Sequence, residues 1–471
     1  MGLSPTTASH VAGVGEQDSF QLVTFNPTGT AVLLQVRNSE YHLPVIKISK
    51  FRRRANEITA ALRNTWGLPT VLLFTDAIIR GLSPAYFAAI EVQEGMHQRP
   101  PNMQWFTIHD ALSHLLPKDN ERRALKSTYA KTISRAEGNG PGPFSRLGWM
   151  RELQDWIGSV IHPLGMELKD FQQLNGSETF SLIRFSTTQR PVWFKAVGEP
   201  NLHEYGISHV LTKLFPNHVP KILATKPEWH AWLMCDGGGV TLDEVQNLFA
   251  WQTALTTLAG LQIESIGTTY DLLEAGFRDL RLATLLDLVD PFLDVIADLM
   301  KQQTKVPPPI LSRGELSQLS ATLNDALRCL AALRIPDTLG HSDFNPGNII
   351  VGPERCLFID WAEAHVGHPF LTFEYFLAHL RKDYPQFAPF ESDLRAAYSQ
   401  MWNSITSPEQ VAEACLFSPL VAVYAYAVSS GVWRDPERLK VPGFQGFLRS
   451  LTRKMKQEAD LMQRRRVECL N

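Results

Sequence analysis

The chain has 471 residues, which is too long for a single hydrophobic core and predicts roughly two to four domains. Its composition, 44% hydrophobic and 20% charged, is that of a globular protein and excludes a fully disordered or collagen-like chain. The net charge of -3 provides no basic excess to neutralise phosphates, so we expect no nucleic-acid partner.

The cysteines and the apolar segments indicate a cytoplasmic protein. The 5 cysteines are far apart and form no CxxC pair, which is typical of a reducing compartment. No basic segment followed by an apolar one is visible at the N-terminus, so no secretory signal is expected. The uncharged run 415–433 approaches the length of a membrane span, but Ser418-Pro419 and Ser429-Ser430-Gly431 favour a helix buried in a helical lobe. We therefore expect no membrane partner.

Residues 1–135 are expected to form a small α/β domain. The first residues of the chain, about 15 in number, are small and polar, which predicts disorder. Apolar runs within 20–37 predict strands joined by the turn Asn26-Pro27-Thr28-Gly29, and helical spacing follows over 55–66, with Gly67 as its stop. Further buried strands are predicted at 71–74 and 89–93.

A run of glycine and proline over 136–143 marks the predicted domain boundary, because such a run extends neither a helix nor a sheet. Residues 136–165 are interpreted as this linker and a connecting helix. Strands are predicted at 179–185 and 192–197, and helical patterns dominate from 241 onward. The remaining domains are then a lobe over 166–236 and a helical lobe over 237–471.

The segment that indicates chemistry is Gly340-His341-Ser342-Asp343-Phe344-Asn345-Pro346-Gly347-Asn348, followed by the strand Leu357-Phe358-Ile359 that ends in Asp360. Phosphoryl transfer needs a carboxylate near the attacking hydroxyl and oxygen ligands that hold Mg²⁺ against nucleotide phosphates. An H-x-D-x-x-x-x-N loop offers Asp343 and Asn348, and Asp360 adds a charged ligand. A polar turn between two strands is the alternative interpretation.

This pattern resembles the catalytic loop of the aminoglycoside phosphotransferase and choline kinase family, whose usual H-G-D is His341-Ser342-Asp343 here. The resemblance implies an α+β, two-lobed protein-kinase-like fold with a small antiparallel β lobe and a large helical lobe, preceded here by the small α/β domain. It implies ATP and Mg²⁺ as cofactors, Asp343 as the catalytic residue, and Asn348 and Asp360 as metal ligands.

The family also places a lysine on a strand, where it contacts nucleotide phosphates and is oriented by a glutamate on the next helix. Lys195 lies in the run 192–197, and Glu204 opens the helical pattern that follows. Glu199 is the alternative partner, and a lone strand lysine is also common at sheet edges.

Two further segments resemble nucleotide-binding parts of the family. The turn 174–179 resembles the loop that covers the nucleotide, in which amides of Gly176 and Ser177 would face phosphates; a plain hairpin turn is the alternative. The segment 231–239 resembles the hinge between lobes, where backbone groups of Met234 and Cys235 would bind adenine; a glycine linker without a ligand is the alternative. Polar residues after Asp360 are candidates for the substrate side or for structural roles: Glu363, His365, His368, Glu374 and His379.

The N-terminal helix is similar to the end of a Nudix helix when aligned on Gly67. The positions that would carry acidic metal ligands are then Ala61, Asn64 and Thr65, so a degenerate, noncatalytic domain is predicted. We expect this domain to be dispensable for chemistry, so that a chain beginning near Phe144 would still bind ATP.

The sequence therefore predicts a phosphotransferase that moves the γ-phosphoryl group of ATP to a hydroxyl of a small molecule, an aminoglycoside-, choline- or sugar-like acceptor. The alternative is a nucleotide-binding pseudokinase that acts as a regulatory scaffold, although a scaffold does not need the complete set Lys195, Asp343, Asn348 and Asp360. The protein is expected to be a monomer or homodimer.

Overall fold

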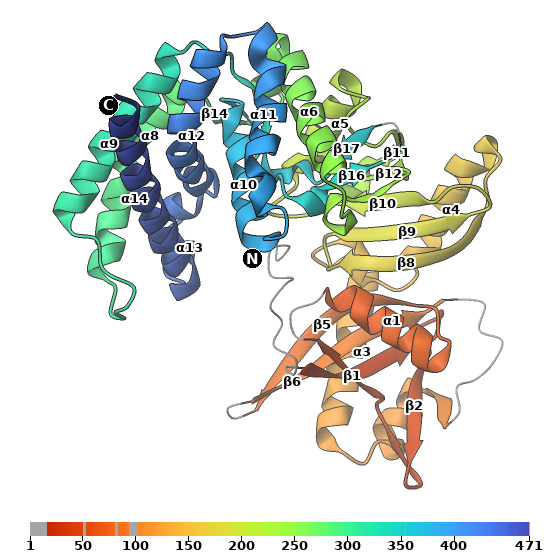
Figure 1. The fold of residues 1–471 in the computed structure, drawn as a ribbon. Coiled ribbons are helices and arrows are strands. Elements are labelled where there is room, and N and C mark those ends of the chain that lie inside the picture. Colours follow the sequence, from red (N-terminus) through yellow and green to blue (C-terminus); the bar gives the residue numbers. More distant parts are fainter. Residues whose placement is uncertain (1–16, 50–52, 81–82, 94–101, 354, 471) are drawn as a thin grey trace. The chain divides into compact units, whose positions relative to one another are not determined.

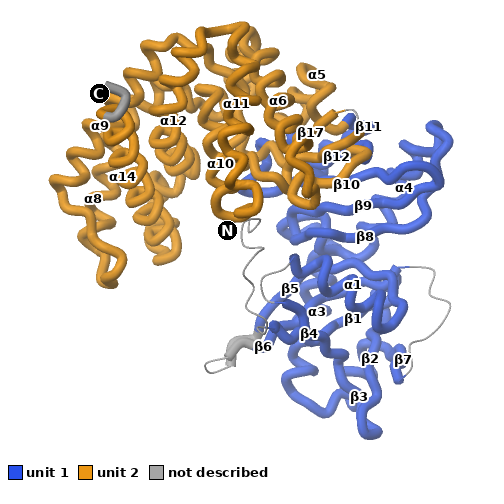
Figure 2. Tube along the Cα trace, in the orientation of Figure 1, with its two compact units in different colours: residues 1–205, 221–236 blue, residues 206–220, 237–471 orange. Residues whose placement is uncertain are grey.

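The structure, a computed structural model, describes residues 17–49, 53–80, 83–93, 102–353 and 355–470, with backbone alone at 78–80, 83–84 and 468–470. The first residues, predicted to be disordered, lie outside this range. The chain divides into two compact units, residues 1–205 with 221–236 and residues 206–220 with 237–471 (Figure 2).

Unit 1 begins with a seven-stranded sheet of order β3-β2-β1-β6-β5, in which β4 also pairs with β1 and β7 with β2. Only the β1–β6 pair among these is parallel. The turn predicted between β1 and β2 is present, and the left-handed conformation of Gly29 (φ 70°) closes it. The strands are β1 (Gln17–Phe25), β2 (Ala31–Arg37), β3 (Glu40–His42), β4 (Val45–Ser49), β5 (Thr70–Arg80), β6 (Ser83–Val92) and β7 (Met103–Thr107).

This sheet has a helix against each face, so both faces of its central strands contribute to a core. Alternate residues point to opposite faces. Leu22 and Leu33 share a core with α1 (Arg54–Trp66), whereas Val23 and Leu34 share one with α3 (Asp119–Ala136). Helix α1 ends at Gly67 (φ 65°), as predicted, because the left-handed residue returns its N–H to the carbonyls of the last turn.

The second sheet of unit 1 is antiparallel throughout, with the order β11-β12-β10-β9-β8. Its core includes the buried face of α4 (Trp149–Ile161), together with Val71, Leu73 and Phe74 of β5 from the first sheet. The two sheets of unit 1 thus share one core, which the predicted boundary at 136–143 did not anticipate. The strands are β8 (Leu168–Gly176), β9 (Ser181–Thr187), β10 (Val192–Ala196), β11 (Ile222–Lys226) and β12 (Ala231–Cys235).

Unit 2 is mainly helical, and one continuous core runs through it. Figure 1 shows its helices in green to blue. Helix α5 (His203–Leu214) crosses from unit 1 into unit 2. The other helices are the short α2 (Ile108–Asp110) of unit 1 and, in unit 2, α6 (Leu248–Glu264), α7 (Thr269–Glu274), α8 (Leu282–Lys301), α9 (Arg313–Ala332), α10 (Phe370–Asp383), α11 (Glu391–Met401), α12 (Pro408–Ser429), α13 (Pro436–Leu439) and α14 (Pro442–Leu470). This α+β composition confirms the predicted fold class.

Two small sheets in unit 2 position the predicted catalytic loop. One has the order β13-β16-β17, and the other has the order β14-β18-β15. The loop leaves β15 at His341 and enters β16 at Ile349, so both of its ends are fixed by strands. The strands are β13 (Val240–Thr241), β14 (Arg278–Leu280), β15 (Thr338–His341), β16 (Ile349–Val351), β17 (Cys356–Phe358) and β18 (Ala364–Gly367).

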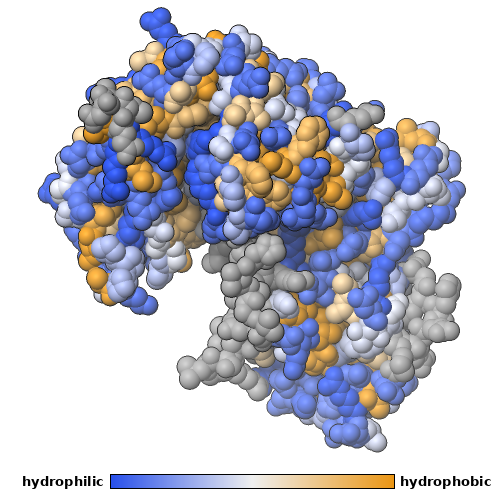
Figure 3. All heavy atoms as spheres, viewed as in Figure 1, coloured by the Kyte–Doolittle hydropathy of each residue, from blue (hydrophilic) through white to orange (hydrophobic). Residues whose placement is uncertain are grey.

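Helix α12 is long and apolar enough to cross a membrane by length and composition alone, but it packs against α8, α9, α10 and α14. Because 61% of its most apolar window is buried by these neighbours, it is a core helix of unit 2. On the face in Figure 3, hydrophilic side chains dominate and apolar ones form separate areas. Exposed apolar side chains include Phe249 (72% exposed) and Tyr270 (70%).

Candidate active site

The Asp343 carboxylate is the centre of a hydrogen-bonded loop between β15 and β16. Oδ1 accepts from Asn345 Nδ2 at 3.0 Å, and Oδ2 accepts from Asn348 Nδ2 at 3.2 Å. The same Asn348 nitrogen donates to the Asp343 carbonyl at 2.9 Å. Asn345 and Asn348 are buried, whereas Asp343 is half-buried. The two side-chain amides therefore hold the carboxylate in place. Asp343 is still partly exposed to solvent.

His341 stabilises this loop through hydrogen bonds of both ring nitrogens. Its Nδ1 accepts the amide of Asp343 at 3.1 Å, so Nε2 must carry the proton that it donates to the Ile359 carbonyl at 3.1 Å. Its own amide donates to Thr372 Oγ1 at 2.9 Å. The imidazole is therefore neutral and fully used in holding the loop against the strand that carries the second aspartate.

Asn348 and Asp360, the predicted metal ligands, are neighbours across the β16–β17 hairpin. The Ile359 amide donates to the Asn348 carbonyl at 3.0 Å, which places Asp360 next to Asn348. Asp360 has a left-handed backbone (φ 66°, ψ 56°), a conformation that costs energy for a residue with a side chain. Among the described residues no three His, Cys, Asp or Glu side chains gather as a metal group. Two oxygen donors completed by phosphate oxygens are, however, a common arrangement for Mg²⁺.

Two tyrosines that the sequence did not single out complete the surroundings of Asp343. Tyr375 on α10 donates its hydroxyl to Asp343 Oδ1 at 3.1 Å. Burial, followed by the negative charge of Asp343, raises the pKa of Tyr375, so the hydroxyl stays protonated. Tyr426 on α12 packs against Tyr375, with the ring centroids 5.2 Å apart and the ring planes tilted by 46°. Burial likewise raises the pKa of Tyr426, with Asp343 as the second cause.

In unit 1, Lys195 on β10 forms an ion pair with Glu204, the first of the two glutamates considered, in the first turn of α5. The Glu204 side chain is 3% exposed and that of Lys195 is 18% exposed. The ammonium group also lies 5.8 Å from the ring centroid of Trp232 on β12. The pair thus joins β10 to α5 and holds the ammonium group of Lys195 in place.

The turn after β8 is closed by its own hydrogen bonds. The Ser177 amide donates to the Phe180 carbonyl at 2.9 Å, and Ser177 Oγ accepts from the amides of Thr179 and Phe180. The Gly176 amide donates to Asn175 Oδ1 at 3.0 Å. The amides of Gly176 and Ser177 are therefore engaged within the turn, which leaves the predicted phosphate contact dependent on a rearrangement.

Met234 and Cys235 lie at the end of β12, beside β10 on one side and β11 on the other. The Cys235 amide donates to the Lys221 carbonyl at 2.9 Å, and Cys235 is buried. The glycines that follow belong to unit 2, where Gly239 packs so closely on Val351 that a side chain would overlap its carbonyl oxygen. Close backbone packing accounts for that glycine without a ligand.

The other polar candidates after Asp360 are mostly structural. His365 and His368 are buried, and burial lowers the pKa of each to about 3, so both are neutral. Glu374 is buried in an ion pair with Arg395, and Glu363 pairs with Arg278. His379 lies beside the site, where its ring is 4.9 Å from that of Tyr375, and His365 Nδ1 is hydrogen-bonded to Ser342 Oγ of the loop at 3.0 Å.

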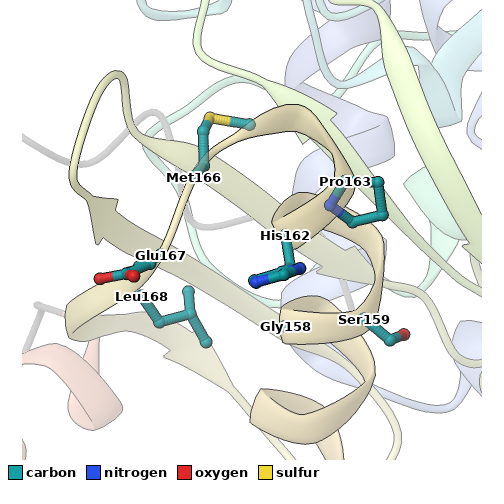
Figure 4. Close-up of a pocket in the computed structure, with 7 residues that line it drawn as sticks. All are labelled: Gly158, Ser159, His162, Pro163, Met166, Glu167 and Leu168. Carbon is teal, nitrogen blue, oxygen red and sulfur yellow. The ribbon is translucent and has the colours of Figure 1, made fainter.

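A shallow pocket in unit 1 lies apart from these residues, where α4 ends and β8 begins (Figure 4). Figure 4 shows His162 and Leu168 on the two sides of this hollow. It includes none of the predicted site residues. Its residues are Gly158, Ser159, His162, Pro163, Met166, Glu167 and Leu168.

A loop that carries such carboxylates is typical of a class of enzyme, the phosphotransferases. Residues 201–412 match the model of the phosphotransferase enzyme family, so this part of the chain is similar to that family. The match confirms the resemblance seen in the catalytic loop. The likeness of the N-terminal helix to a Nudix helix and the predicted domain limits stay predictions.

Solved structures of similar proteins include small-molecule kinases. Ethanolamine kinase from Plasmodium vivax is 13% identical, with a TM-score of 0.45 over 75% of this chain and 91% of that one. Choline kinase from Streptococcus pneumoniae is 14% identical, with a TM-score of 0.40 over 65% and 99%. Macrolide 2'-phosphotransferase from Brachybacterium faecium is 13% identical, with a TM-score of 0.42 over 64% and 97%. No curated protein sequence matches this chain.

Proposed function

We propose that this protein transfers the γ-phosphoryl group of ATP to a hydroxyl of a small molecule, with Mg²⁺ as the metal. The observation that carries the proposal is the Asp343 carboxylate, held by Asn345, Asn348 and Tyr375 inside the segment that matches the phosphotransferase family. A carboxylate fixed in this way is suited to orient an acceptor hydroxyl and to take its proton.

Asn348 and Asp360 fit Mg²⁺ as oxygen donors. The Asn348 nitrogen faces Asp343, so its side-chain oxygen faces away from that carboxylate and is available to a cation. Bound there, Mg²⁺ would neutralise charge on the transferring phosphoryl group. Lys195, oriented by Glu204, would hold the remaining phosphate oxygens in the same reaction.

The charges around α10 favour an acceptor with few positive charges. Glu374 and Glu391 pair with Arg395 and Arg381. Asp383 lies 3.7 Å from the ammonium group of Lys382. Since a polycationic acceptor is attracted by unpaired acidic groups, this region gives it little electrostatic help. In a panel of hydroxylated compounds, neutral acceptors should be phosphorylated at lower concentrations than aminoglycosides, and the opposite order would contradict the assignment.

Asp343→Asn tests the proposed function. The substitution keeps the shape of the side chain but removes its charge and one of its two acceptor oxygens, so binding of ATP with Mg²⁺ should persist. Phosphoryl transfer, or slow hydrolysis of ATP where the acceptor is not known, should fall by roughly 10²–10⁴-fold. Calorimetric titration and phosphate release measure the two effects.

Two companion variants separate the alternatives. Asp360→Ala should remove the Mg²⁺ dependence of ATP binding as well as turnover, and Asp287→Asn, an exposed acid on α8, should change neither. A parent protein that binds ATP yet shows no turnover with any acceptor or with water would favour the pseudokinase scaffold. Undiminished turnover in Asp343→Asn would reject the catalytic assignment.

A further inference from the structure

The N-terminal domain reaches the turn that resembles the nucleotide-covering loop. Arg135, in the last turn of α3, donates from Nη2 to Glu178 Oε1 in that turn at 2.7 Å. The Arg135 side chain is only 11% exposed, and its guanidinium carbon lies 3.7 Å from the ring centroid of Phe74. An arginine stacked on an aromatic ring and paired with a carboxylate is ordered before any ligand binds.

The backbone after α3 also contacts this turn. A Cβ on Gly142 would lie 2.3 Å from the Glu178 carbonyl oxygen, so the two backbones are in direct contact and no side chain fits between them. Two residues later the Phe144 amide donates to the same oxygen at 3.3 Å. The glycine and proline run that the sequence marks as a linker therefore serves as a contact surface for the turn.

The strand that leads into the turn is tied to the first sheet as well. Gln173 Oε1 accepts the Leu72 amide at 2.8 Å, and Gln173 Nε2 donates to the Leu72 carbonyl at 3.2 Å. The β5–β6 register shifts between Leu72 and Phe74, and such a bulge leaves backbone groups without partners in its ladder. Gln173 satisfies those groups from β8, which aligns the end of β8 with the first sheet.

We propose that the N-terminal domain is a positioning element for nucleotide binding, with Arg135 as its principal residue. Arg135 and the backbone of Gly142 contact the turn, and Leu72 holds the strand that leads into it through Gln173. All of these residues belong to unit 1. The domain thus sets the conformation of the turn after β8. This inference rests on the proposed function for the role of the turn, but the contacts themselves do not depend on it.

The test compares Arg135→Ala with Arg63→Ala in the full chain. Arg63 pairs with Asp170 at the other end of β8, so it controls for general loss of contact between the two sheets. In Arg135→Ala the dissociation constant for ATP with Mg²⁺ should rise roughly three- to tenfold, whereas ATP hydrolysis at saturating ATP should stay within about twofold. A purely structural role would lower the unfolding midpoint without this selective loss of affinity.

Hydrogen exchange over residues 174–180 gives a readout that needs no nucleotide. The amides of this turn should exchange faster in Arg135→Ala and in Glu178→Gln, by similar factors and without further increase in the double variant, because both remove one ion pair. Arg63→Ala should leave their exchange unchanged.

The outcomes distinguish the two proposals. Unchanged exchange of the turn in both Arg135→Ala and Glu178→Gln would overturn the positioning role. A parent protein that binds no ATP, with faster exchange in these variants, would reject the nucleotide site and leave the positional role of Arg135 supported. If Arg135→Ala does not fold, Glu178→Gln provides the same exchange measurement from the other side of the pair.

Discussion

Tyr375 on α10 contacts the carboxylate of the predicted catalytic loop. Its hydroxyl donates to Asp343 Oδ1, and its own ring is backed by Tyr426 and His379. The hydroxyl is a neutral donor, so it orients the carboxylate oxygen that it contacts. We interpret Tyr375 as a positioning residue for the proposed reaction.

Tyr375→Phe should lower kcat by about 10- to 100-fold, because a hydrogen bond to a charged group is worth roughly 1.5–3 kcal/mol. ATP binding should not change. Tyr384→Phe, at the end of the same helix, is the control. A kcat equal to that of the parent protein would show that the hydroxyl does not position Asp343.

The separation of partners along the chain explains which site residues the sequence could predict. Asp343, Asn348 and Asp360 fall within one short segment, and Lys195 and Glu204 are 9 residues apart, so each set is visible as a spacing. Tyr375 is 32 residues from Asp343, and Arg135 is 43 residues from Glu178. No local pattern marks such pairs, since they depend on how helices and sheets pack.

At the scale of elements, the sequence predicted helices and strands where the apolar spacing is regular. Helix α1, its stop at Gly67, and strands β1, β2, β9 and β10 lie close to their predicted ranges. Strand β8 (Leu168–Gly176) was not predicted as a strand in its own right, because it alternates polar and apolar residues weakly and exposes several polar side chains.

A buried acid on the first sheet, Glu91, ties the start of α4 to that sheet. Glu91 on β6 is 2% exposed and accepts the amide of Gly148, the residue before the helix, at 2.9 Å. Burial raises the pKa of Glu91 from 4.5 to about 7, although the amide of Gly148 opposes this shift. The folded chain therefore retains a proton on Glu91 at a pH where the unfolded chain has lost it.

From this shift we expect the free energy of unfolding to fall as pH rises from about 4.5 to about 7, by up to about 3 kcal/mol. The sign follows because the folded state binds more protons than the unfolded state across that window. Glu91→Gln keeps an acceptor for Gly148 without a charge, so its unfolding free energy should lack this part of the pH dependence.

Urea unfolding at pH 5 and pH 8 measures the difference. Glu137→Gln, an exposed glutamate at the end of α3, should keep the pH dependence of the parent. If the unfolding free energy has the same pH dependence in the parent protein and in Glu91→Gln, Glu91 does not stay protonated in the folded state.

At the scale of the whole molecule, the sequence located the phosphotransferase segment but did not show that the first sheet shares a core with the second. Glycines and prolines over 136–143 correctly mark a break in secondary structure after α3. Composition alone does not show that the chain on each side of such a break contributes to one core, as Phe74 and Phe144 do here.

The sequence predicts that a chain beginning near Phe144 still binds ATP, whereas the shared core leads us to predict that such a chain does not fold stably by itself. Val71, Leu73 and Phe74 are almost fully buried in the core that also contains Trp149 and Phe194. Burial of each of these three side chains is worth about 1.5–3 kcal/mol, and their sum approaches the total stability of a typical domain.

A chain of residues 144–471 should accordingly lose cooperative unfolding of the second sheet, bind an apolar dye, and aggregate at concentrations where the full chain is soluble. Phe74→Ala in the full chain should reproduce part of the effect, with a loss of about 3–5 kcal/mol in unfolding free energy. Phe20→Ala provides the matched control, because Phe20 lies in the separate core beside α1 and should leave nucleotide binding intact at temperatures where the chain is folded. If the shortened chain unfolds in one sharp transition and binds ATP as tightly as the full chain, the shared core and the positioning role of Arg135 are both wrong.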